Sequence, residues 1–226
     1  MNFTLVTPTC DRPEAFALCQ KWMARQIIPY HQWIVLDDGL NPAKCTMGQI
    51  HLCYTKTRGK GSLANKLKLL LSDSSTITGD AIALIEDDDW YAPNYLELAA
   101  SRFEDYDMIG EGYALYYNVR RRWWHLHTND RHASLCQTLI RRSGLEAFAA
   151  CLNDPDPFID VRLWKTKLRS KLYLPEIDRH SLVGIKGLYP GYGIGHERPL
   201  PHLDPQLSKL KKVIGSESGV YAGYYS

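Results

Sequence analysis

Apolar and polar residues alternate with two different periods in the first half of the chain, and this pattern predicts an alternation of strands and helices. We expect strands over residues 3–7, 32–36, 50–54 and 81–85, and helices over residues 13–25, 62–71 and 92–103. Pro13 in a first turn and Ser62 at an N-cap position favour two of these helix starts. The order β-α-β-β-α-β is typical of a mostly parallel sheet in an α/β protein.

The periodicity changes in the second half of the chain. Shorter strands are expected over residues 108–118, 122–127 and 135–140, and helices near residues 143–151 and 158–171. We find no internal repeat and no low-complexity linker, so we expect a single domain over residues 1–226. The glycine-rich residues 184–196 predict a mobile lid near its end.

The composition, 45% hydrophobic and 23% charged, is that of a folded globular protein and excludes a disordered class. Six cysteines without CxxC spacing disfavour a zinc site or a disulfide framework. The amino terminus lacks the basic and then apolar order of a signal peptide, and every apolar stretch is far shorter than the roughly 20 residues that span a bilayer. We therefore expect a soluble, cytoplasmic protein that does not bind a membrane.

The charged residues are unevenly distributed although the net charge is only +2. Residues 53–72 carry five basic residues and no acid, residues 80–107 carry nine acids and one base, and residues 119–142 carry six arginines, three histidines and one acid. A single charge run is usually a solvated face. The alternation of three runs indicates a phosphate-binding region, a metal-binding region and a second region that faces an anion.

Four acids, Glu86 to Asp89, directly follow the apolar strand predicted over residues 81–85. Their mutual repulsion costs free energy unless a cation lies among them. Carboxylate oxygens suit Mg²⁺ or Mn²⁺, ions that bridge carboxylates to phosphates. We expect Asp88 to be the first metal ligand, Asp87 and Asp89 to be next, and Glu86 to lie near the ribose or in a supporting shell. Alternatively, the run is an acidic loop that only solubilises the strand end.

Short motifs follow one another in a fixed order over about the first 100 residues: Thr7-Pro8-Thr9 with Arg12-Pro13, Asp37-Asp38-Gly39, residues 61–65, and Glu86-Asp87-Asp88-Asp89-Trp90 with Pro93 and Tyr95-Leu96. Together they resemble the nucleotide-binding half of family 2 glycosyltransferases. The resemblance implies a GT-A fold, in which a Rossmann-like nucleotide-binding sheet carries a smaller acceptor-binding lobe. It further implies a nucleoside diphosphate sugar donor, usually UDP-linked, a DXD motif for Mn²⁺ or Mg²⁺, and inverting transfer by a hexosyltransferase. Residues 1–103 would form the nucleotide-sugar-binding half and residues 104–226 the acceptor-binding half.

The resemblance also assigns expected roles to residues that bind the donor. By this match the nucleoside pocket is lined by Pro8, Thr9 and Arg12, the base is held by Asp38, and the nucleoside or phosphates lie beside Lys60 and Asn65. In the acidic run, Glu86 and Asp87 are expected to bind the donor. Glu86 stands where the family usually has aspartate. Taken singly, such residues also serve as turn caps, helix caps or surface residues.

A later segment, residues 156–164, is similar to the late acidic motif of the family, although Ile159 stands where glutamate is common. Asp160 is the candidate base that takes the acceptor's proton; as an alternative, Asp160 or Asp156 caps the following helix. His196, after the glycine-rich segment, would complete the metal or diphosphate site, with His180 in reserve. The resemblance further suggests that Lys186 reaches the diphosphate.

The acceptor is least determined by the sequence. Residues 120–127 interleave cations and aromatics, as nucleic-acid surfaces do, but such aromatics also stack on sugars or pack a strand. The basic runs, and the resemblance of residues 185–196 to small viral-type glycosyltransferases, favour a hydroxymethylated pyrimidine in DNA, with a location in host cytoplasm if the protein is viral. A saccharide or protein acceptor remains open.

Two other classes of function are weighed against a glycosyltransferase. A Mg²⁺-dependent nucleotidyltransferase would carry a glycine-rich phosphate loop after its first strand, where residues 8–12 contain no glycine. A non-catalytic nucleic-acid-binding module would be disfavoured by its own acidic run unless a metal filled it. The sequence therefore favours the glycosyltransferase.

Overall fold

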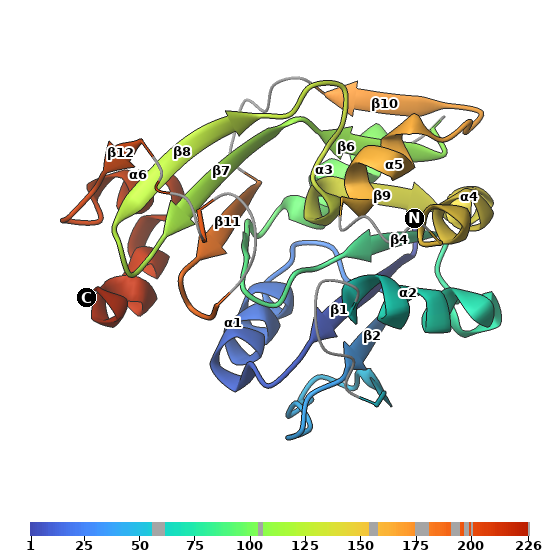
Figure 1. The fold of residues 1–226 in the computed structure, drawn as a ribbon, viewed down its shortest axis with the longest axis horizontal. Helices are drawn as coiled ribbons and strands as arrows, with labels where there is room; N and C mark the ends of the chain where they lie inside the picture. The colour runs from blue at the N-terminus through green and yellow to red at the C-terminus, as the bar shows by residue number, and fades with distance from the viewer. Residues whose placement is uncertain are drawn as a thin grey trace.

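The structure is a computed structural model that describes residues 1–55, 62–103, 106–153, 158–174, 181–190, 195–196, 199 and 201–225. Within these residues a seven-stranded sheet has the order β10-β6-β9-β4-β1-β2-β3 (Figure 1). Its strands are β1 (Phe3–Thr9), β2 (Gln32–Asp37), β3 (Ile50–Cys53), β4 (Ala81–Leu84), β6 (Met108–Glu111), β9 (Thr138–Arg141) and β10 (Lys171–Leu174). Adjacent strands from β4 to β3 are parallel, and β9 runs antiparallel between β4 and β6. The expected parallel-dominated α/β sheet is confirmed.

A second sheet, five-stranded within the described residues, has the order β12-β8-β7-β11-β5. It comprises β5 (Trp90–Tyr91), β7 (Tyr113–Asn118), β8 (Trp123–Thr128), β11 (Leu182–Lys186) and β12 (His202–Leu203). Strand β11 is parallel to β7 and antiparallel to β5. Because β5 directly follows the acidic run, the second sheet is attached to the first at the position of that run.

Helices cover both faces of the large sheet (Figure 1). One apolar cluster packs α2 (Ser62–Ser72), α4 (Leu145–Cys151) and α5 (Ile159–Lys165) on the face that carries Val6 and Leu84. The other packs α1 (Pro13–Ala24) and α3 (Tyr95–Arg102) on the face that carries Leu5 and Ala83. Alternate strand residues thus enter opposite cores, as a sheet buried on both sides requires. Short 3-10 turns are η1 (Ser74–Thr76), η2 (Leu135–Gln137) and η3 (Arg142–Gly144).

A carboxy-terminal segment, unpredicted by the sequence pattern, completes the core. It consists of α6 (Ser208–Ile214) and the 3-10 segment η4 (Gly215–Tyr224), and it buries Tyr221 completely. Glu217 pairs with Arg25 at 2.8 Å and accepts a hydrogen bond from Trp90 Nε1 at 2.7 Å. The segment is therefore tied to the strand that follows the acidic run. Among the described helices, none combines the length and apolar character needed to cross a membrane.

Several predicted boundaries differ from the observed ones. The strand expected over residues 108–118 is divided at Gly112. The helix expected over residues 158–171 ends at Lys165, where Thr166 adopts an extended conformation, and β10 begins at Lys171. Residues 184–186 of the expected lid lie in the fully buried strand β11. Residues 191–194 of the expected lid lie outside the described residues.

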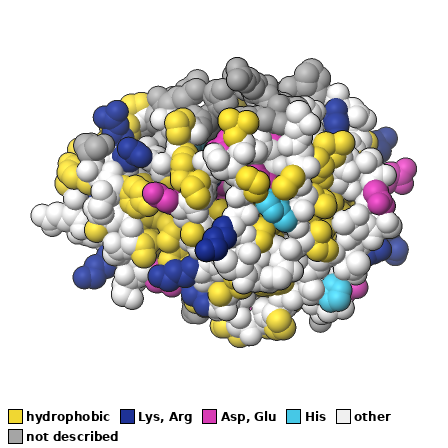
Figure 2. Space-filling model, turned by 90° about the horizontal axis from the view of Figure 1, so that it is seen from below, with side chains coloured by type: hydrophobic (Ala, Val, Ile, Leu, Met, Phe, Trp, Pro, Cys, Tyr) yellow, Lys and Arg dark blue, Asp and Glu magenta, His cyan; other side chains and the backbone are white. Residues whose placement is uncertain are grey.

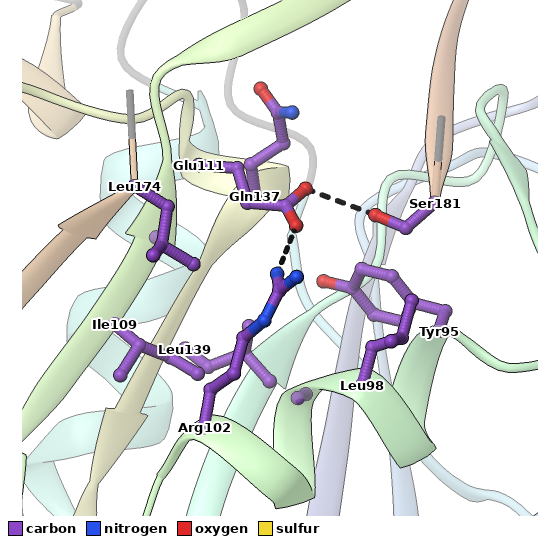
Figure 3. Close-up of a pocket in the computed structure, with 11 residues that line it drawn as sticks. Tyr95, Leu98, Arg102, Ile109, Glu111, Gln137, Leu139, Leu174 and Ser181 are labelled. Carbon is purple, nitrogen blue, oxygen red and sulfur yellow. Dashed lines mark hydrogen bonds and ion pairs between the residues drawn. The ribbon is translucent and has the colours of Figure 1, made fainter. Parts of the chain in front are cut away.

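A small polar cluster lies between α3 and β6 (Figure 3). Glu111 receives Arg102 Nη1 at 2.8 Å and the Ser181 hydroxyl at 3.0 Å. Burial raises the pKa of Glu111, and the hydrogen bonds from Ser181 and Arg102 oppose this rise. The adjoining cavity of about 20 Å³ has room for about one water molecule, so we assign this cluster a structural role.

Candidate active site

The candidate site lies where β1, β2 and β4 end, since adjacent parallel strands bring their carboxyl ends to one edge of the sheet. Thr9 pairs in register with Asp37, and Thr9 Oγ1 donates to Asp87 Oδ2 at 2.7 Å. The half-buried Pro8 lies on the same strand end. The structure therefore brings together the three polar motifs that the sequence places after separate strands.

Asp38 is held by helix α2. Its carboxylate accepts hydrogen bonds from Lys66 Nζ at 2.7 Å and from Ser62 Oγ at 2.5 Å. Lys66 Nζ also donates to the Thr9 carbonyl at 2.9 Å. Burial opposes ionisation of Asp38, but the hydrogen bonds from Lys66 and Ser62 outweigh it and lower its pKa. Lys66 thus links the ends of β1 and β2.

Sequence reasoning did not single out Lys66. It named Asn65, which is exposed on α2, and Lys60, which lies outside the described residues. A usable signal was its position four residues after Ser62, on the helix face that also buries Leu67 and Leu70. A lysine on an apolar helix face requires a buried partner.

The neighbouring Asp37 builds the loop instead of facing the site. Its Oδ1 accepts from Gly39 N at 2.8 Å, and its Oδ2 accepts from Ala43 N at 2.7 Å and lies 3.0 Å from His51 Nε2. A Cβ on Gly39 would lie 2.7 Å from the backbone nitrogen of Asp11, so this close approach requires glycine. Asp37 therefore fixes the turn that positions Asp38.

Arg12 neutralises one side of the acidic run. Its Nη1 lies 3.0 Å from Asp87 Oδ1 and 3.3 Å from Asp88 Oδ2. Burial works against the guanidinium charge, but Asp87 and Asp88 raise the pKa of Arg12. Burial raises the pKa of Asp87 to about 6, with Arg12 opposing and Asp88 reinforcing the rise.

Lys186 neutralises the other side, from strand β11. Its Nζ lies 3.4 Å from Asp89 Oδ1 and 3.9 Å from Glu86 Oε2, and Ile185 N donates to the same Asp89 oxygen at 2.9 Å. Burial raises the pKa of Asp89 and of Glu86, while Lys186 opposes both rises. Asp89 consequently connects the acidic run to the second sheet.

The site fits a divalent cation. Arg12 and Lys186 are the cations that contact the run within the described residues, which leaves an excess of two negative charges when all four acids are ionised. Asp89 Oδ2 is buried without a partner of hydrogen-bond geometry among the described residues. Donor atoms of Glu86, Asp89 and Cys136 lie within 4.8 Å of one another, although the Lys186 ammonium already contacts both carboxylates.

His196 is the expected ligand on the Asp88 side. Burial lowers its pKa to about 4, with the nearby charges of Lys186 and Arg12 contributing and Asp88 opposing. A neutral imidazole at pH 7 keeps a lone pair for a metal. The charge of Asp88 thus acts on His196, as expected if both residues bind one metal ion.

A cavity of about 550 Å³ opens beside the acidic run. Glu86 and Lys186 form part of its wall, and Asp160 in the first turn of α5 forms another part. Burial raises the pKa of Asp160, and Asp160 in turn raises the pKa of Glu86. Asp160 Oδ1 also accepts from the Val161 amide at 2.9 Å, so the carboxylate supports the helix start and faces the cavity. Asp156 and His180 lie outside the described residues.

The basic runs are less available to a ligand than the sequence suggests. Four arginines donate to backbone carbonyls: Arg120 to Gly187 at 2.6 Å, Arg122 to Ala222 at 2.9 Å, Arg141 to Phe103 at 2.5 Å and Arg142 to Gly79 at 3.2 Å. Arg120, Arg121 and Arg131 are exposed. On the face seen in Figure 2, Lys and Arg side chains are scattered and do not form one continuous stripe.

No protein-family model and no curated protein matches the sequence. Solved structures do match. S. aureus TarS 1-349 in complex with UDP-GlcNAc has a TM-score of 0.56 and 13% identity over 94% of this chain and 64% of that chain. The same protein with UDP has a TM-score of 0.56 and 12% identity over 82% of this chain and 60% of that chain. Mannosyltransferase PcManGT from Pyrobaculum calidifontis, in complex with GDP-Man and Mn²⁺, has a TM-score of 0.54 and 15% identity over 86% of this chain and 58% of that chain.

These similarities define the fold class. The protein has the GT-A glycosyltransferase fold, as expected from its sequence motifs. The chain spans 58 to 64% of the length of these three matched chains.

Proposed function

We propose that the protein is a metal-dependent, inverting glycosyltransferase that transfers a sugar from a nucleoside diphosphate sugar to an acceptor hydroxyl. The observation that carries the proposal is a run of four acids on a GT-A fold, only partly neutralised by Arg12 and Lys186, beside a cavity that Asp160 also lines. The matched structures, which are complexes with UDP, UDP-GlcNAc, or GDP-Man and Mn²⁺, support a nucleotide-sugar donor.

In this proposal the nucleoside lies at the ends of β1 and β2. Pro8, Thr9 and Arg12 line that edge, and the Asp38 carboxylate accepts a hydrogen bond from an N–H group of the base. A carboxylate has lone pairs beyond those used by Lys66 and Ser62, so Asp38 still has the capacity to bind a base. Because Lys66 and Ser62 already fix the carboxylate, binding requires little further ordering.

The metal would be Mn²⁺ or Mg²⁺, held by Asp88, Asp89 and His196. When bound, it supplies positive charge to the diphosphate as the bond to the sugar breaks. Arg12 now occupies Asp88 Oδ2 at 3.3 Å, so it must share that carboxylate with the ion. Lys186 lies on the opposite side of the run and adds a fixed positive charge for the diphosphate.

Asp160 serves as the base in this scheme. The acceptor oxygen attacks the anomeric carbon, the bond from that carbon to the diphosphate breaks, and the acceptor's proton moves to the Asp160 carboxylate. Burial raises the pKa of Asp160, and a base is more effective as its pKa approaches the working pH. The shared cavity explains how one acceptor could reach both Asp160 and the donor sugar.

For the acceptor we propose a 5-hydroxymethylpyrimidine in DNA, with a saccharide or protein hydroxyl as the alternative. Support comes from the exposed Arg121, whose guanidinium lies 5.9 Å from the ring centre of the half-buried Trp123. The neighbouring Arg120 is also exposed, with its Nε donating to the Gly187 carbonyl at 2.6 Å. Such a cation and aromatic pair suits a phosphate backbone and a base.

The test is to incubate the protein with Mn²⁺ and a panel of nucleotide sugars and to record which releases nucleoside diphosphate. Labelled sugar is then offered to hydroxymethylated DNA, unmodified DNA, oligosaccharides and peptides. We expect one donor to be hydrolysed and hydroxymethylated DNA to be labelled. Inert nucleotide sugars, with pyrophosphate released from a nucleoside triphosphate, would establish a nucleotidyltransferase instead. Labelling of a saccharide or peptide alone would replace the DNA acceptor.

A further inference from the structure

One histidine of the cavity wall has a defined tautomer. His132 lines the cavity together with Asp160, and its Nδ1 lies 2.9 Å from the carbonyl oxygen of Asp130. A carbonyl oxygen can only accept a hydrogen bond, so Nδ1 must carry the proton. In the neutral ring, Nε2 then keeps a lone pair and can accept a hydrogen bond from a ligand.

The loop that carries His132 is anchored at both ends. Tyr173 Oη donates to the Asn129 carbonyl, and the Tyr116 and Ser134 hydroxyls lie 3.0 Å apart. Gly112 leaves room for the tyrosine, since a Cβ there would lie 2.0 Å from Tyr173 Oη. These contacts hold the imidazole in place before any ligand binds, which reduces the entropy cost of binding.

His132 and Asp160 act on the same ligand space. Both line the cavity, and a charge on His132 stabilises the Asp160 carboxylate. The wall of one cavity thus presents two hydrogen-bond acceptors, a carboxylate and a lone-pair nitrogen, which match a ligand with two donors. A single isolated hydroxyl would satisfy one of the two.

We propose that His132 Nε2 is an acceptor-binding site that receives an O–H or N–H donor adjacent to the reacting hydroxyl. The inference rests on the proposed transfer, in which Asp160 takes the proton of the reacting hydroxyl. His132 would therefore select acceptors in which a second hydrogen-bond donor flanks the reacting hydroxyl. In 5-hydroxymethylcytosine an amino group flanks the hydroxymethyl group, whereas in 5-hydroxymethyluracil a carbonyl does; a vicinal diol of a saccharide also qualifies.

The variants His132→Asn and His132→Gln separate the two ring nitrogens. The amide of asparagine can replace Nδ1 but not Nε2, whereas the amide oxygen of glutamine reaches the position of Nε2. We expect His132→Asn to raise the acceptor KM about tenfold, the usual effect of one lost hydrogen bond, and His132→Gln to raise it less. Binding of the nucleotide sugar without acceptor, measured by calorimetry, should be unchanged in both. The control is His202→Asn on β12, which changes an exposed histidine that is not part of the cavity wall.

Paired acceptors test the chemistry directly. Wild type should prefer 5-hydroxymethylcytosine over 5-hydroxymethyluracil in DNA, or a methyl glycoside over its singly deoxygenated analogue, and His132→Asn should lose that preference. Equal KM values for wild type and His132→Asn would overturn the inference. A wild type that releases no nucleoside diphosphate from any donor would count against the proposed function instead. Independently of turnover, ¹⁵N NMR of His132 should show the Nδ1–H tautomer; an Nε2–H tautomer would refute the assignment.

Discussion

Lys66→Met removes the ammonium that bridges Asp38 and the Thr9 carbonyl while keeping a long apolar side chain. Both acceptors are buried and lie 2.7 and 2.9 Å from Nζ. Breaking a buried ion pair by removing one partner costs about 3–5 kcal/mol. Because the Ser62 hydroxyl still donates to Asp38, we expect the low end of that range, about 3 kcal/mol. The free energy of unfolding of a native protein is about 5–15 kcal/mol, so this loss is a large fraction of it.

Urea unfolding is the assay. With a slope of about 2 kcal/mol per molar, the midpoint should fall by about 1.5 M while the slope stays constant. The matched control is Lys68→Met, a half-buried lysine on the same helix, which should shift stability by less than about 0.5 kcal/mol. If Lys66→Met behaved like this control, the Lys66–Asp38 bridge would have no role in stability.

The pH dependence gives an independent check on Asp38. Its pKa is lowered in the folded state, so its pairing contributes stability above its unfolded pKa of about 3.9, and that contribution is lost as pH falls through the folded pKa. The gap between wild type and Lys66→Met should therefore shrink below about pH 4. A gap that is constant from pH 7 to pH 3 would point to lost packing in place of lost charge.

Four further outcomes follow from the site. Asp88→Asn should abolish Mn²⁺-dependent donor binding, measured by calorimetry, with the circular dichroism spectrum unchanged; full binding would remove Asp88 from the metal ligands. Asp160→Asn should lower turnover roughly 10²-fold or more at near-normal donor affinity, whereas a loss of affinity at normal turnover would make it a binding residue. Because burial raises the pKa of Asp87 to about 6 and also raises those of Glu86 and Asp89, Mn²⁺ should bind more weakly at pH 5.5 than at pH 7.5 and release protons on binding. Calorimetry in buffers of different ionisation enthalpy measures this release, and its absence would contradict the prediction. Replacing Arg120 and Arg121 by alanine should weaken DNA binding and reduce its salt slope by up to about two units without affecting donor hydrolysis, and an unchanged slope would exclude them from phosphate contacts.

The strands of the first half could be predicted because each is a short segment rich in apolar residues. Residues 81–85, followed at once by four acids, are the clearest case, and the observed strand β4 covers residues 81–84. The acidic run, Arg12 and Asp38 could be placed at one sheet edge because parallel strands align their carboxyl ends.

Features that depend on packing between distant segments could not be predicted. Lys66 becomes buried only when α2 packs beside β1 and β2, and the proton position of His132 depends on a loop contact with Asp130. The glycines after residue 183 suggest mobility in sequence, yet Gly184 serves close packing: a Cβ there would lie 2.5 Å from Tyr116 Cδ1. A glycine required for space and one required for flexibility look the same in a sequence.

The reactivity of the Cys136 thiol can report on the exposure of the acidic run, because its sulfur lies beside Glu86 and Asp89. The thiol is buried, its pKa is raised by burial and by the charges of Glu86 and Asp89, and its sulfur lies within 4.8 Å of a carboxylate oxygen of each. Only the thiolate reacts with alkylating reagents, so the folded protein protects this cysteine twice, by enclosure and by protonation. The rate at which Cys136 is alkylated therefore depends on how often the structure around the acidic run opens. A cation or nucleotide that stabilises the closed structure would slow this alkylation.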